Sequence, residues 1–246
     1  MTEIKTINVM GYHVLAEEID AIKINDDAKR IVNTINPHSY VTAKKDMVFQ
    51  SALLDSDMLL PDGSGKVLAA RQIHKVQIKK IAGSDLHIHL LEELNKKGGS
   101  CFYMGARQET LDKIKERLKR EYPNVKAGFY SPPYRENFLG EENEEILKRI
   151  KAFGPDVLFV GMTAPKQEKW LYRNKDHLDF KIACCIGAVF DFYAGTVQRS
   201  SPFWVNNHME WLPRLVKEPK RMWKRNFVST PIFLKDMMLY KAGLKK

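Results

Sequence analysis

The segment "LLPDGSGKVL", which covers residues 59–68, places an aspartate between two apolar runs, after a proline and before a glycine. In an Asp-Gly pair the carboxylate usually accepts backbone N–H groups within a turn, and the glycine takes a positive φ. A carboxylate at a loop tip can also act as a general base when a hydroxyl group comes within hydrogen-bond reach. The segment alone favours the turn, so Asp62 is a candidate base that needs support from the rest of the chain.

The segment "GMTAPKQEKW", residues 161–170, is a second place where the residue types could do chemistry. Pro165 fits the first turn of a helix, and the free amide groups of a helix N-terminus can receive phosphate. Gln167 and Glu168 would then lie in that first turn, close to any bound group. The ordinary alternative is a helix start without a ligand, in which Glu168 complements the positive end of the helix dipole.

An alternating scaffold is expected to position these residues. Short β-branched or aromatic runs predict strands over 30–35, 57–60, 76–81, 100–104, 125–129, 156–160 and 181–187. Helical patterns lie between them, over 42–54, 64–73, 85–97, 107–120, 141–152 and 165–174. Alternation with short links predicts an α/β fold, namely a Rossmann-like, doubly wound, mostly parallel sheet with helices on both faces.

In such a sheet, ligands bind beyond the carboxyl ends of the strands. Each unusual polar or glycine cluster follows an expected strand: Asn36, Asp62, Gly83, Gly105, the run 161–167 and the run 187–191. Turns alone would place about half of such clusters on the opposite edge. We therefore expect one site along this edge, where Lys80, Arg107 and two helix N-termini would supply positive charge.

Several patterns that resemble other sites are discounted. Asp55 and Asp57 have the Asp-x-Asp spacing of a metal-diphosphate site, but they precede their strand and read as a helix-ending turn. His87 and His89 face different directions on an expected helix, and no zinc cluster accompanies them. The chain has no Gly-x-Gly-x-x-Gly after a strand and no Walker sequence. We therefore expect no metal and no dinucleotide cofactor.

The composition is that of a folded protein in a reducing compartment. The chain has 246 residues, of which 44% are hydrophobic and 28% charged, enough for one large α/β domain or a domain with an appendage. Three cysteines neither form a disulfide framework nor show zinc spacing. The first residues are polar and acidic, and no apolar run approaches the roughly 20 residues that span a bilayer. We expect a cytoplasmic protein, soluble or peripheral to a membrane.

Positive charge is concentrated in the C-terminal part. The net charge is +10, and residues 199–246 hold eleven basic against three acidic side chains and three of the four tryptophans. We therefore expect a catalytic α/β domain over 1–198 and a basic, aromatic appendage over 199–246, suited to polyanions such as nucleic acid, anionic headgroups or diphosphates. Thr230 and Pro231 open its last helix, which either packs on the body or lies at a membrane interface.

Six segments, in this order, resemble the WecG/TagA/CpsF family of bacterial glycosyltransferases: "TINP", "LLPDGSG", "IAGSDL", "FVGMTAPKQEKW", "IGAVFDFYAG" and "EWLPRLVKEPKR". The resemblance runs from about residue 33 to 225. It implies transfer of a sugar, such as N-acetylmannosamine or its uronic acid, from a UDP donor to a polyprenyl-diphosphate-linked sugar, with inversion at the anomeric carbon. Such enzymes act without a metal at the inner face of the plasma membrane, in the synthesis of teichoic acids, capsules and exopolysaccharides.

The resemblance assigns the role of base to Asp62, which reverses the preference for a simple turn. Together with the edge argument it gives an expected substrate-binding set of Thr34, Asn36, Gly63, Lys80, Gly105, Arg107, Pro165, Gln167, Glu168 and Asp191. The lipid diphosphate and headgroups would meet Arg214, Arg221, Lys224 and Arg225. Lys80 departs from many relatives, which carry arginine there; lysine keeps the charge but loses the bidentate fork.

Two rival functions belong to other classes. A nucleic-acid-binding module would explain the basic tail and would bind oligonucleotides in a salt-sensitive way, but it leaves both motif clusters unexplained. A non-catalytic nucleotide-sugar-binding relative would keep the fold, although this chain retains its candidate base. We expect an anionic membrane surface and no nucleic acid as partner. The sequence leaves open the donor sugar, the acceptor sugar and the oligomeric state, since an apolar tail could pack on a second copy.

Overall fold

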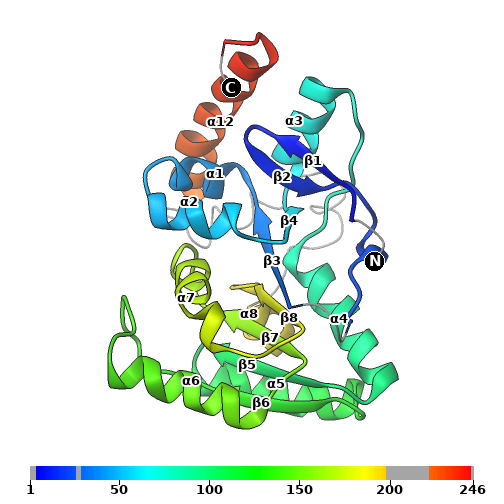
Figure 1. Ribbon diagram of the computed structural model, residues 1–246, viewed down its shortest axis with the longest axis vertical. Coiled ribbons are helices and arrows are strands. Elements are labelled where there is room, and N and C mark those ends of the chain that lie inside the picture. Colours follow the sequence, from blue (N-terminus) through cyan, green and yellow to red (C-terminus); the bar gives the residue numbers. More distant parts are fainter. Residues whose placement is uncertain (1–3, 26–28, 198–221, 245–246) are drawn as a thin grey trace.

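A computed structural model describes residues 4–25, 29–197 and 222–244. It contains one eight-stranded sheet with helices on both faces (Figure 1), in the strand order β1-β2-β4-β3-β8-β7-β5-β6. The expected α/β, Rossmann-like fold is confirmed. The strands are β1 (Thr6–Val9), β2 (Tyr12–Leu15), β3 (Arg30–Ile35), β4 (Met58–Pro61), β5 (Ser100–Gly105), β6 (Lys126–Tyr130), β7 (Val157–Gly161) and β8 (Ile182–Cys185).

The described helices cover both faces of the sheet and one end of it. They are η1 (Ile19–Ala21), α1 (Pro37–Ala43), α2 (Met47–Leu54), α3 (Ser64–His74), α4 (Gly83–Lys97), α5 (Gln108–Glu121), α6 (Glu141–Phe153), α7 (Lys166–Asn174), η2 (Lys175–His177), α8 (Val189–Ala194), η3 (Lys224–Ser229) and α12 (Thr230–Lys241). Helices α4, α5 and α8 bury one face, and α6 and α7 bury the other. Helices α1, α2, α3 and α12 enclose the end formed by β1, β2 and β4.

The strand β7 shows why the middle of the sheet is uniformly apolar. Val157 and Phe159 pack in the core under α4 and α5, whereas Leu158 and Val160 pack in the core under α6 and α7. All four side chains have no exposed surface. A parallel sheet covered on both faces requires this continuous apolar run rather than an alternating one. The expected strands at 30–35, 57–60, 100–104, 125–129, 156–160 and 181–187 are confirmed to within a few residues.

The expected strand over 76–81 is wrong. Residues 75–82 form an irregular segment between α3 and α4, in which Ile78 and Ile81 are buried and Val76 is exposed. Ile78 and Ile81 are buried by packing across the end of the sheet, where the Ile81 amide donates to the Pro61 carbonyl at 3.2 Å. A run of β-branched residues can be buried in this way without forming a strand, because a strand also needs a neighbouring strand to pair with.

The antiparallel hairpin β1–β2 was outside the prediction. Its two-residue turn places Met10 at φ 56° and Gly11 at φ 84°, and Val9 pairs with Tyr12. Two positive φ values match the turn that joins antiparallel strands most tightly. In the sequence, the apolar residues on either side of Gly11 are the pattern that would have predicted this hairpin. The hairpin extends the parallel sheet through Val14, which pairs with Leu59 of β4.

The expected helix over 42–54 is two helices, α1 and α2. Asn36 caps α1, and its Oδ1 accepts the amides of His38 and Ser39 at 3.0 Å each. Asp46 caps α2 by accepting the amide of Phe49 at 3.0 Å. A capping aspartate within a helical pattern indicates a new start rather than a continuation. The structure also adds the short helix α8 after β8, which the prediction read only as a loop cluster.

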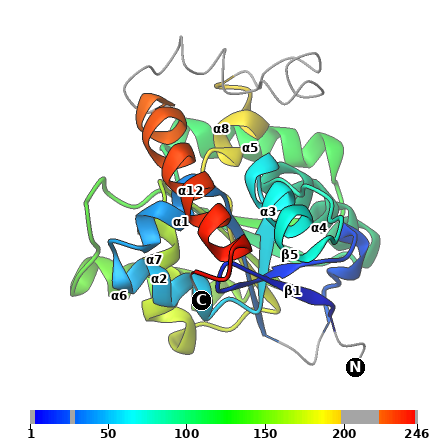
Figure 2. The same ribbon diagram turned by 90° about the horizontal axis from the view of Figure 1, so that it is seen from above.

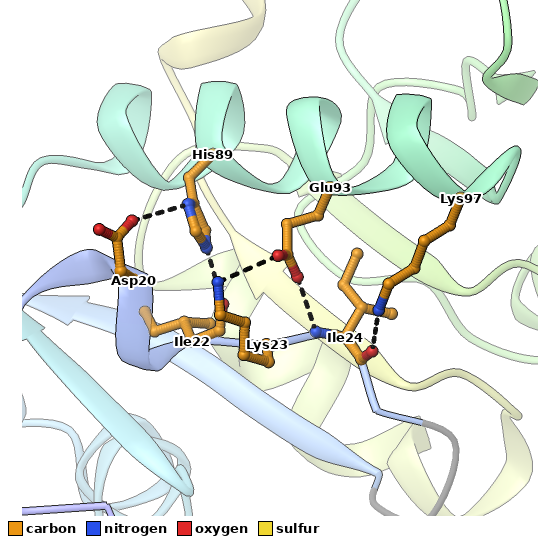
Figure 3. Close-up of polar contacts among 7 residues, drawn as sticks. All are labelled: Asp20, Ile22, Lys23, Ile24, His89, Glu93 and Lys97. Atoms are coloured by element: carbon orange, nitrogen blue, oxygen red, sulfur yellow. Dashed lines mark hydrogen bonds and ion pairs between the residues drawn. The ribbon is translucent and has the colours of Figure 1, made fainter.

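Helix α4 fixes residues 20–24 with side chains one turn apart (Figure 3). His89 Nε2 lies 2.7 Å from the Ile22 carbonyl, Glu93 accepts the Ile24 amide at 3.2 Å, and Lys97 donates to the Ile24 carbonyl at 2.8 Å. Positions i, i+4 and i+8 lie on one helix face, so these three side chains can all hydrogen-bond to the backbone of residues 22–24. His87 turns inward instead and bonds the Tyr103 hydroxyl at 2.6 Å. The prediction that the two histidines point apart is confirmed.

The C-terminal helix α12 packs on the body beside α1 and α3 (Figures 1 and 2). Phe233 has no exposed surface, and Met237 is 5% exposed. Asp236 accepts hydrogen bonds from the Tyr40 hydroxyl at 3.0 Å and from the Lys44 ammonium at 2.6 Å. Helix α12 therefore packs on the body, which is the first of the two alternatives expected from the sequence. The division at 198/199 falls where the described residues stop, so it stays a prediction.

Lys66 is the most unusual side chain of this region, since it has no exposed surface. Its ammonium lies over three rings, at 5.0 Å from the centroid of Tyr12, 4.8 Å from Tyr40 and 5.6 Å from Phe233. Its Nζ donates to the Val9 carbonyl at 3.3 Å. Ring faces attract a cation, yet burial without a carboxylate favours the neutral amine, and burial lowers the pKa of Lys66 to about 7.

We expect the substitution Lys66→Met to raise the free energy of unfolding at pH 7 by about 1–3 kcal/mol, because it removes a buried polar group. The pKa of Lys66 is about 7 in the folded chain, against an ordinary value of 10.5. Between these values the unfolded chain binds more protons, so wild-type stability rises with pH, and the variant lacks this rise. Urea denaturation between pH 7 and 10 measures both effects. Lys115→Met, on the exposed face of α5, is the control, and equal pH dependence in wild type and Lys66→Met would contradict the burial.

Candidate active site

The predicted common edge is confirmed for five of its six clusters. Asn36 follows β3, Asp62 follows β4, Gly105 ends β5, Gly161 ends β7 and Gly187 follows β8. All five strands run parallel, so these residues share the carboxyl edge of the sheet. The strands β4, β3, β8 and β7 are consecutive neighbours, and three spacings of about 4.8 Å give an edge of about 14 Å.

The sixth cluster reaches the same edge by another route. Gly83 does not follow a strand, because it opens α4. A Cβ atom at Gly83 would lie 3.4 Å from a methyl carbon of Val189 and 3.6 Å from Ile186. The N-terminus of α4 therefore lies against the loop that follows β8.

Asp62 stands on a loop that is tied to the neighbouring strand. Its amide donates to the Ile35 carbonyl of β3 at 3.1 Å and to the Leu60 carbonyl at 2.9 Å. Gly63 follows with φ 85° as the N-cap of α3, so the expected positive φ is confirmed. The backbone of Asp62 is thus fixed by β3, and its half-buried side chain belongs to the carboxyl edge.

Two of the expected pocket residues come from β3. Thr34 pairs with Leu60 of β4 and is half-buried. The carboxamide oxygen of Asn36 is engaged by the first turn of α1, which leaves the Nδ2 group as the donor that Asn36 can offer to a ligand. Lys80 lies in the segment that crosses the end of β4 and is also half-buried. The loop contact between Ile81 and Pro61 brings Lys80 to the same end of the sheet as Asp62.

The chain diverges between β5 and β7. The connection after β5 leads outward to β6, and the connection after β7 leads back to β8, so this is a topological switch point. Gly105 and Gly161 are paired there. Gly105 has φ 116°, and a Cβ atom on it would lie 2.4 Å from the Gly161 carbonyl oxygen. The exposed Arg107 follows as the N-cap of α5.

The segment that opens α7 is confirmed as a helix start, but its side chains are more buried than expected. The Ala164–Pro165 peptide bond is cis, and α7 begins at Lys166. Gln167 is 5% exposed and Glu168 is 3% exposed. Gln167 Oε1 accepts the amide of Met162 at 3.1 Å, and its Nε2 donates to Glu168 Oε1 at 2.9 Å. A Cβ on Gly187 would lie 3.4 Å from Gln167 Oε1, so the Gln167 side chain spans the ends of β7 and β8.

Glu168 is a buried acid with one unmatched oxygen. Within the described part of the chain its Oε2 has no hydrogen-bond partner. Burial raises the pKa of Glu168 to about 7, against the opposing effect of the Gln167 amide. Burial, and after it the charge of Glu168, raises the pKa of the neighbouring Cys185 thiol on β8. An acid in this setting holds its proton near neutrality, which a helix-dipole role on a surface would not require.

Asp191 lies where α8 meets α5. Its Oδ1 accepts hydrogen bonds from the Thr110 hydroxyl at 3.4 Å and from the Thr196 hydroxyl at 3.2 Å. Helix α8 is fixed in this way to the helix that follows the switch point. The expected donor-site role of Asp191 stays a prediction.

The predicted lipid contacts are only partly visible. Arg214 and Arg221 lie outside the described residues. Lys224 is exposed and Arg225 half-buried, both in η3. The Ser229 hydroxyl at the end of η3 lies 2.8 Å from His38 Nδ1 in the first turn of α1. This contact places η3 next to the carboxyl end of β3, close to Asn36.

An apolar surface accompanies these charges. Trp223 is 59% exposed and Phe227 47% exposed, with ring centroids 4.5 Å apart. Val228 and Met238 are exposed as well. Within 4–25, 29–197 and 222–244, no helix combines the length and apolarity needed to cross a bilayer.

The patterns that were discounted have structural roles. Asp57 Oδ2 accepts the Ile31 amide at 2.7 Å, and Asp55 pairs with Lys175, both at the amino end of the sheet. Among the residues that the structure describes, no three His, Cys, Asp or Glu side chains gather as metal ligands. Sequence reasoning did not single out Lys66 or His38. No local pattern marks Lys66, because its enclosure comes from Tyr12, Tyr40 and Phe233.

Comparisons with known proteins identify relatives of this chain. The profile of a family described as "Glycosyl transferase WecG/TagA/CpsF family" matches residues 4–246. A protein of Bacillus subtilis (strain 168) is 31% identical over 219 residues, 89% of this chain and 80% of its own length. A Bacillus spizizenii (strain ATCC 23059 / NRRL B-14472 / W23) protein is 28% identical, covering 93% and 86%. A Staphylococcus aureus (strain MW2) protein is 25% identical, covering 94% and 89%. All three are named N-acetylglucosaminyldiphosphoundecaprenol N-acetyl-beta-D-mannosaminyltransferase.

We expect Gly105→Ala to lower the free energy of unfolding by about 1–3 kcal/mol, because its Cβ would overlap the Gly161 carbonyl oxygen. The matched control is Gly98→Ala, which also has a positive φ but meets no atom within 4 Å, and should cost about 1 kcal/mol. Urea denaturation compares the two variants. A Gly105→Ala protein as stable as the control would contradict the close approach at the switch point.

Proposed function

The chain belongs to the WecG/TagA/CpsF family of glycosyltransferases, and we propose that it moves N-acetylmannosamine or a related sugar from a UDP donor to N-acetylglucosamine on a polyprenyl diphosphate. The names of the relatives support the transferred sugar and the acceptor. The observation that carries the proposal is the position of Asp62, whose loop is fixed by Ile35 at the carboxyl edge. Such a product would enter a cell-surface polysaccharide.

In the proposed reaction Asp62 takes the proton of the acceptor hydroxyl. The oxygen attacks the anomeric carbon from the face opposite the diphosphate, and the bond from this carbon to the UDP oxygen breaks as the new glycosidic bond forms. One displacement inverts the configuration. The electron pair and negative charge leave with UDP, so the site must stabilise an anion.

Positive charge for the leaving UDP would come from groups spread along the carboxyl edge. The amide groups at the N-termini of α5 and α7 lie at the ends of β5 and β7, with Arg107 at the start of α5, and Lys80 lies at the end of β4. The glycine pair Gly105 and Gly161 lets a ligand approach the backbone at the switch point. A donor lying along the edge could then present its sugar near Asp62 and its nucleotide near α7. No step of this scheme requires a metal ion.

The acceptor is proposed to arrive from the side of η3. This helix contacts the first turn of α1 through Ser229 and His38. It exposes Phe227 and Lys224, and Trp223 is exposed just before it. Each basic residue near an anionic surface contributes on the order of 1 kcal/mol. Together with Arg214, Arg221 and Arg225, these groups would hold the chain peripherally at the inner face of the plasma membrane, beside the lipid-linked acceptor.

We expect Asp62→Asn to lower kcat by about 10²–10⁴-fold while the donor still binds, because the amide cannot accept the hydroxyl proton. UDP release is measured with UDP-N-acetylmannosamine and a short-chain polyprenyl-diphosphate N-acetylglucosamine, and donor binding by calorimetry. Asp179→Asn, on an exposed turn before β8, is the matched control. Turnover near the wild-type rate in Asp62→Asn would exclude it as the base, and wild-type donor binding without transfer would instead favour a non-catalytic relative.

We expect the double substitution Trp223→Ser and Phe227→Ser to reduce co-sedimentation with anionic phospholipid vesicles by at least about tenfold, because two exposed rings are lost from the proposed contact surface. Substitution is preferable to truncation, since removing α12 would also expose the core around Phe233. The control is Leu139→Ser, another exposed apolar residue remote from η3. Equal sedimentation of the double variant and wild type would remove η3 from the membrane contact.

A further inference from the structure

Glu168 lies in the first turn of α7 and is almost fully buried. It is 3% exposed, one oxygen accepts the Gln167 amide at 2.9 Å, and the other has no partner among the described residues. A buried carboxylate oxygen without a donor costs about 1–3 kcal/mol or more if it is charged. A proton on Oε2 removes most of this penalty and leaves Oε1 free to accept.

In the part of the chain that the structure describes, no neighbouring cation offsets the charge of Glu168. On α7 itself, Lys169 pairs with Asp46 of α2 at 2.8 Å, and Lys166 lies over the Phe138 ring at 4.1 Å. From β8 the group tied to it electrostatically is the Cys185 thiol, which burial and Glu168 both keep protonated. The surroundings of Glu168 therefore favour the neutral acid.

The same acid fixes one end of the Gln167 carboxamide. The Met162 amide donates to Oε1 of Gln167, and Nε2 of Gln167 donates to Glu168. A reversed carboxamide would set two donors against each other at Met162, and at Glu168 it would set its oxygen against the unprotonated Oε1. Between them, these contacts determine which way Gln167 faces beside Gly187.

We infer that Glu168 is a positioning residue, which acts as a neutral acid to hold the Gln167 carboxamide in the orientation that the donor meets at the ends of β7 and β8. The inference rests on the proposed function, since it takes the donor to be an anionic nucleotide-sugar. When Glu168 loses its proton, an uncompensated negative charge appears under the diphosphate site. Donor capture then weakens because like charges repel.

The direction of the pH effect follows from the buried acid. Its pKa is raised from 4.5 to about 7, so the folded protein holds this proton up to about neutral pH. The value of kcat/KM for the donor, which reports groups of the free enzyme, should therefore fall as pH rises through about 7. Because Cys185 on β8 and the ammonium groups of Lys166 and Lys169 on α7 also lie around this helix start, the pH profile of Glu168→Gln is the measurement that assigns the fall to Glu168.

The test compares Glu168→Gln and Glu168→Leu with a matched control. Helix α5 also opens with Gln-Glu, at Gln108 and Glu109, but there the glutamate is exposed and pairs with Lys113 at 3.0 Å. Glu109→Gln therefore makes the same chemical change at the other strand-to-helix turn. Donor kinetics are measured from pH 6 to 9, and UDP-N-acetylmannosamine binding is measured by calorimetry over the same range.

Glu168→Gln keeps an acceptor for Gln167 and cannot ionise. We expect donor kcat/KM within about twofold of wild type at pH 6.5, with the alkaline fall reduced by at least about fivefold at pH 8.5. Glu168→Leu loses the acceptor, so the donor KM should rise about tenfold with little change in kcat, as for loss of a binding contact. Glu109→Gln should match wild type throughout.

An alkaline fall that persists unchanged in Glu168→Gln would overturn the inference, as would a wild-type donor KM in Glu168→Leu. Calorimetry separates this failure from failure of the proposed function. If the wild-type chain binds donor with the expected pH dependence but transfers no sugar, the role of Glu168 stands and the transferase does not. If transfer depends on Asp62 but donor binding does not depend on Glu168, the transferase stands and the role of Glu168 does not. Absence of donor binding in wild type would contradict both.

Discussion

The parallel pairing of β3 with β4 on one side and β8 on the other is the constraint on which the site depends. It sets Ile35 beside Pro61, so that the Asp62 amide reaches the Ile35 carbonyl and the loop cannot swing away from β3. It also sets the end of β8 next in line, followed by β7 with its helix start at Lys166. Antiparallel pairing at any of these positions would send one cluster to the opposite edge. The direction and pairing of the strands therefore decide which residues share the site, whatever their side chains are.

The C-terminal helix is part of the same arrangement. A Cβ on Gly65 would lie 2.4 Å from Pro37 and 3.4 Å from Phe233, so the start of α3 packs directly between α1 and α12. The next residue, Lys66, places its ammonium group among aromatic rings of β2, α1 and α12. The loop that carries Asp62 and the helix that follows η3 thus share one packed cluster. Burial of an amine there is an energetic cost that apolar residues would not carry.

Sequence patterns predicted the sheet well because its inner strands are apolar runs bounded by glycine and proline, as in "DVLFV". They predicted the edge clusters because parallel strands bring their ends together. They failed at 76–81, where β-branched residues are buried without a partner strand, and at the Met10–Gly11 hairpin, whose strands are only four residues long. Asn36 and Asp46 are recognisable in the sequence as helix-capping residues, but the prediction of the helices did not use them. The depth of Glu168 and the enclosure of Lys66 depend on contacts from β8, β2 and α12, which no local pattern contains.

The central claim is that a carboxylate at the end of β4 drives one displacement at an anomeric carbon. The most direct measurement is the anomeric configuration of the product, read from the one-bond carbon–proton coupling after purified protein acts on UDP-N-acetylmannosamine and a polyprenyl-diphosphate N-acetylglucosamine. A single displacement predicts a β-linked product from the α-linked donor, formed only when the acceptor is present. An α-linked product, or hydrolysis of the donor that is indifferent to the acceptor, would contradict the account.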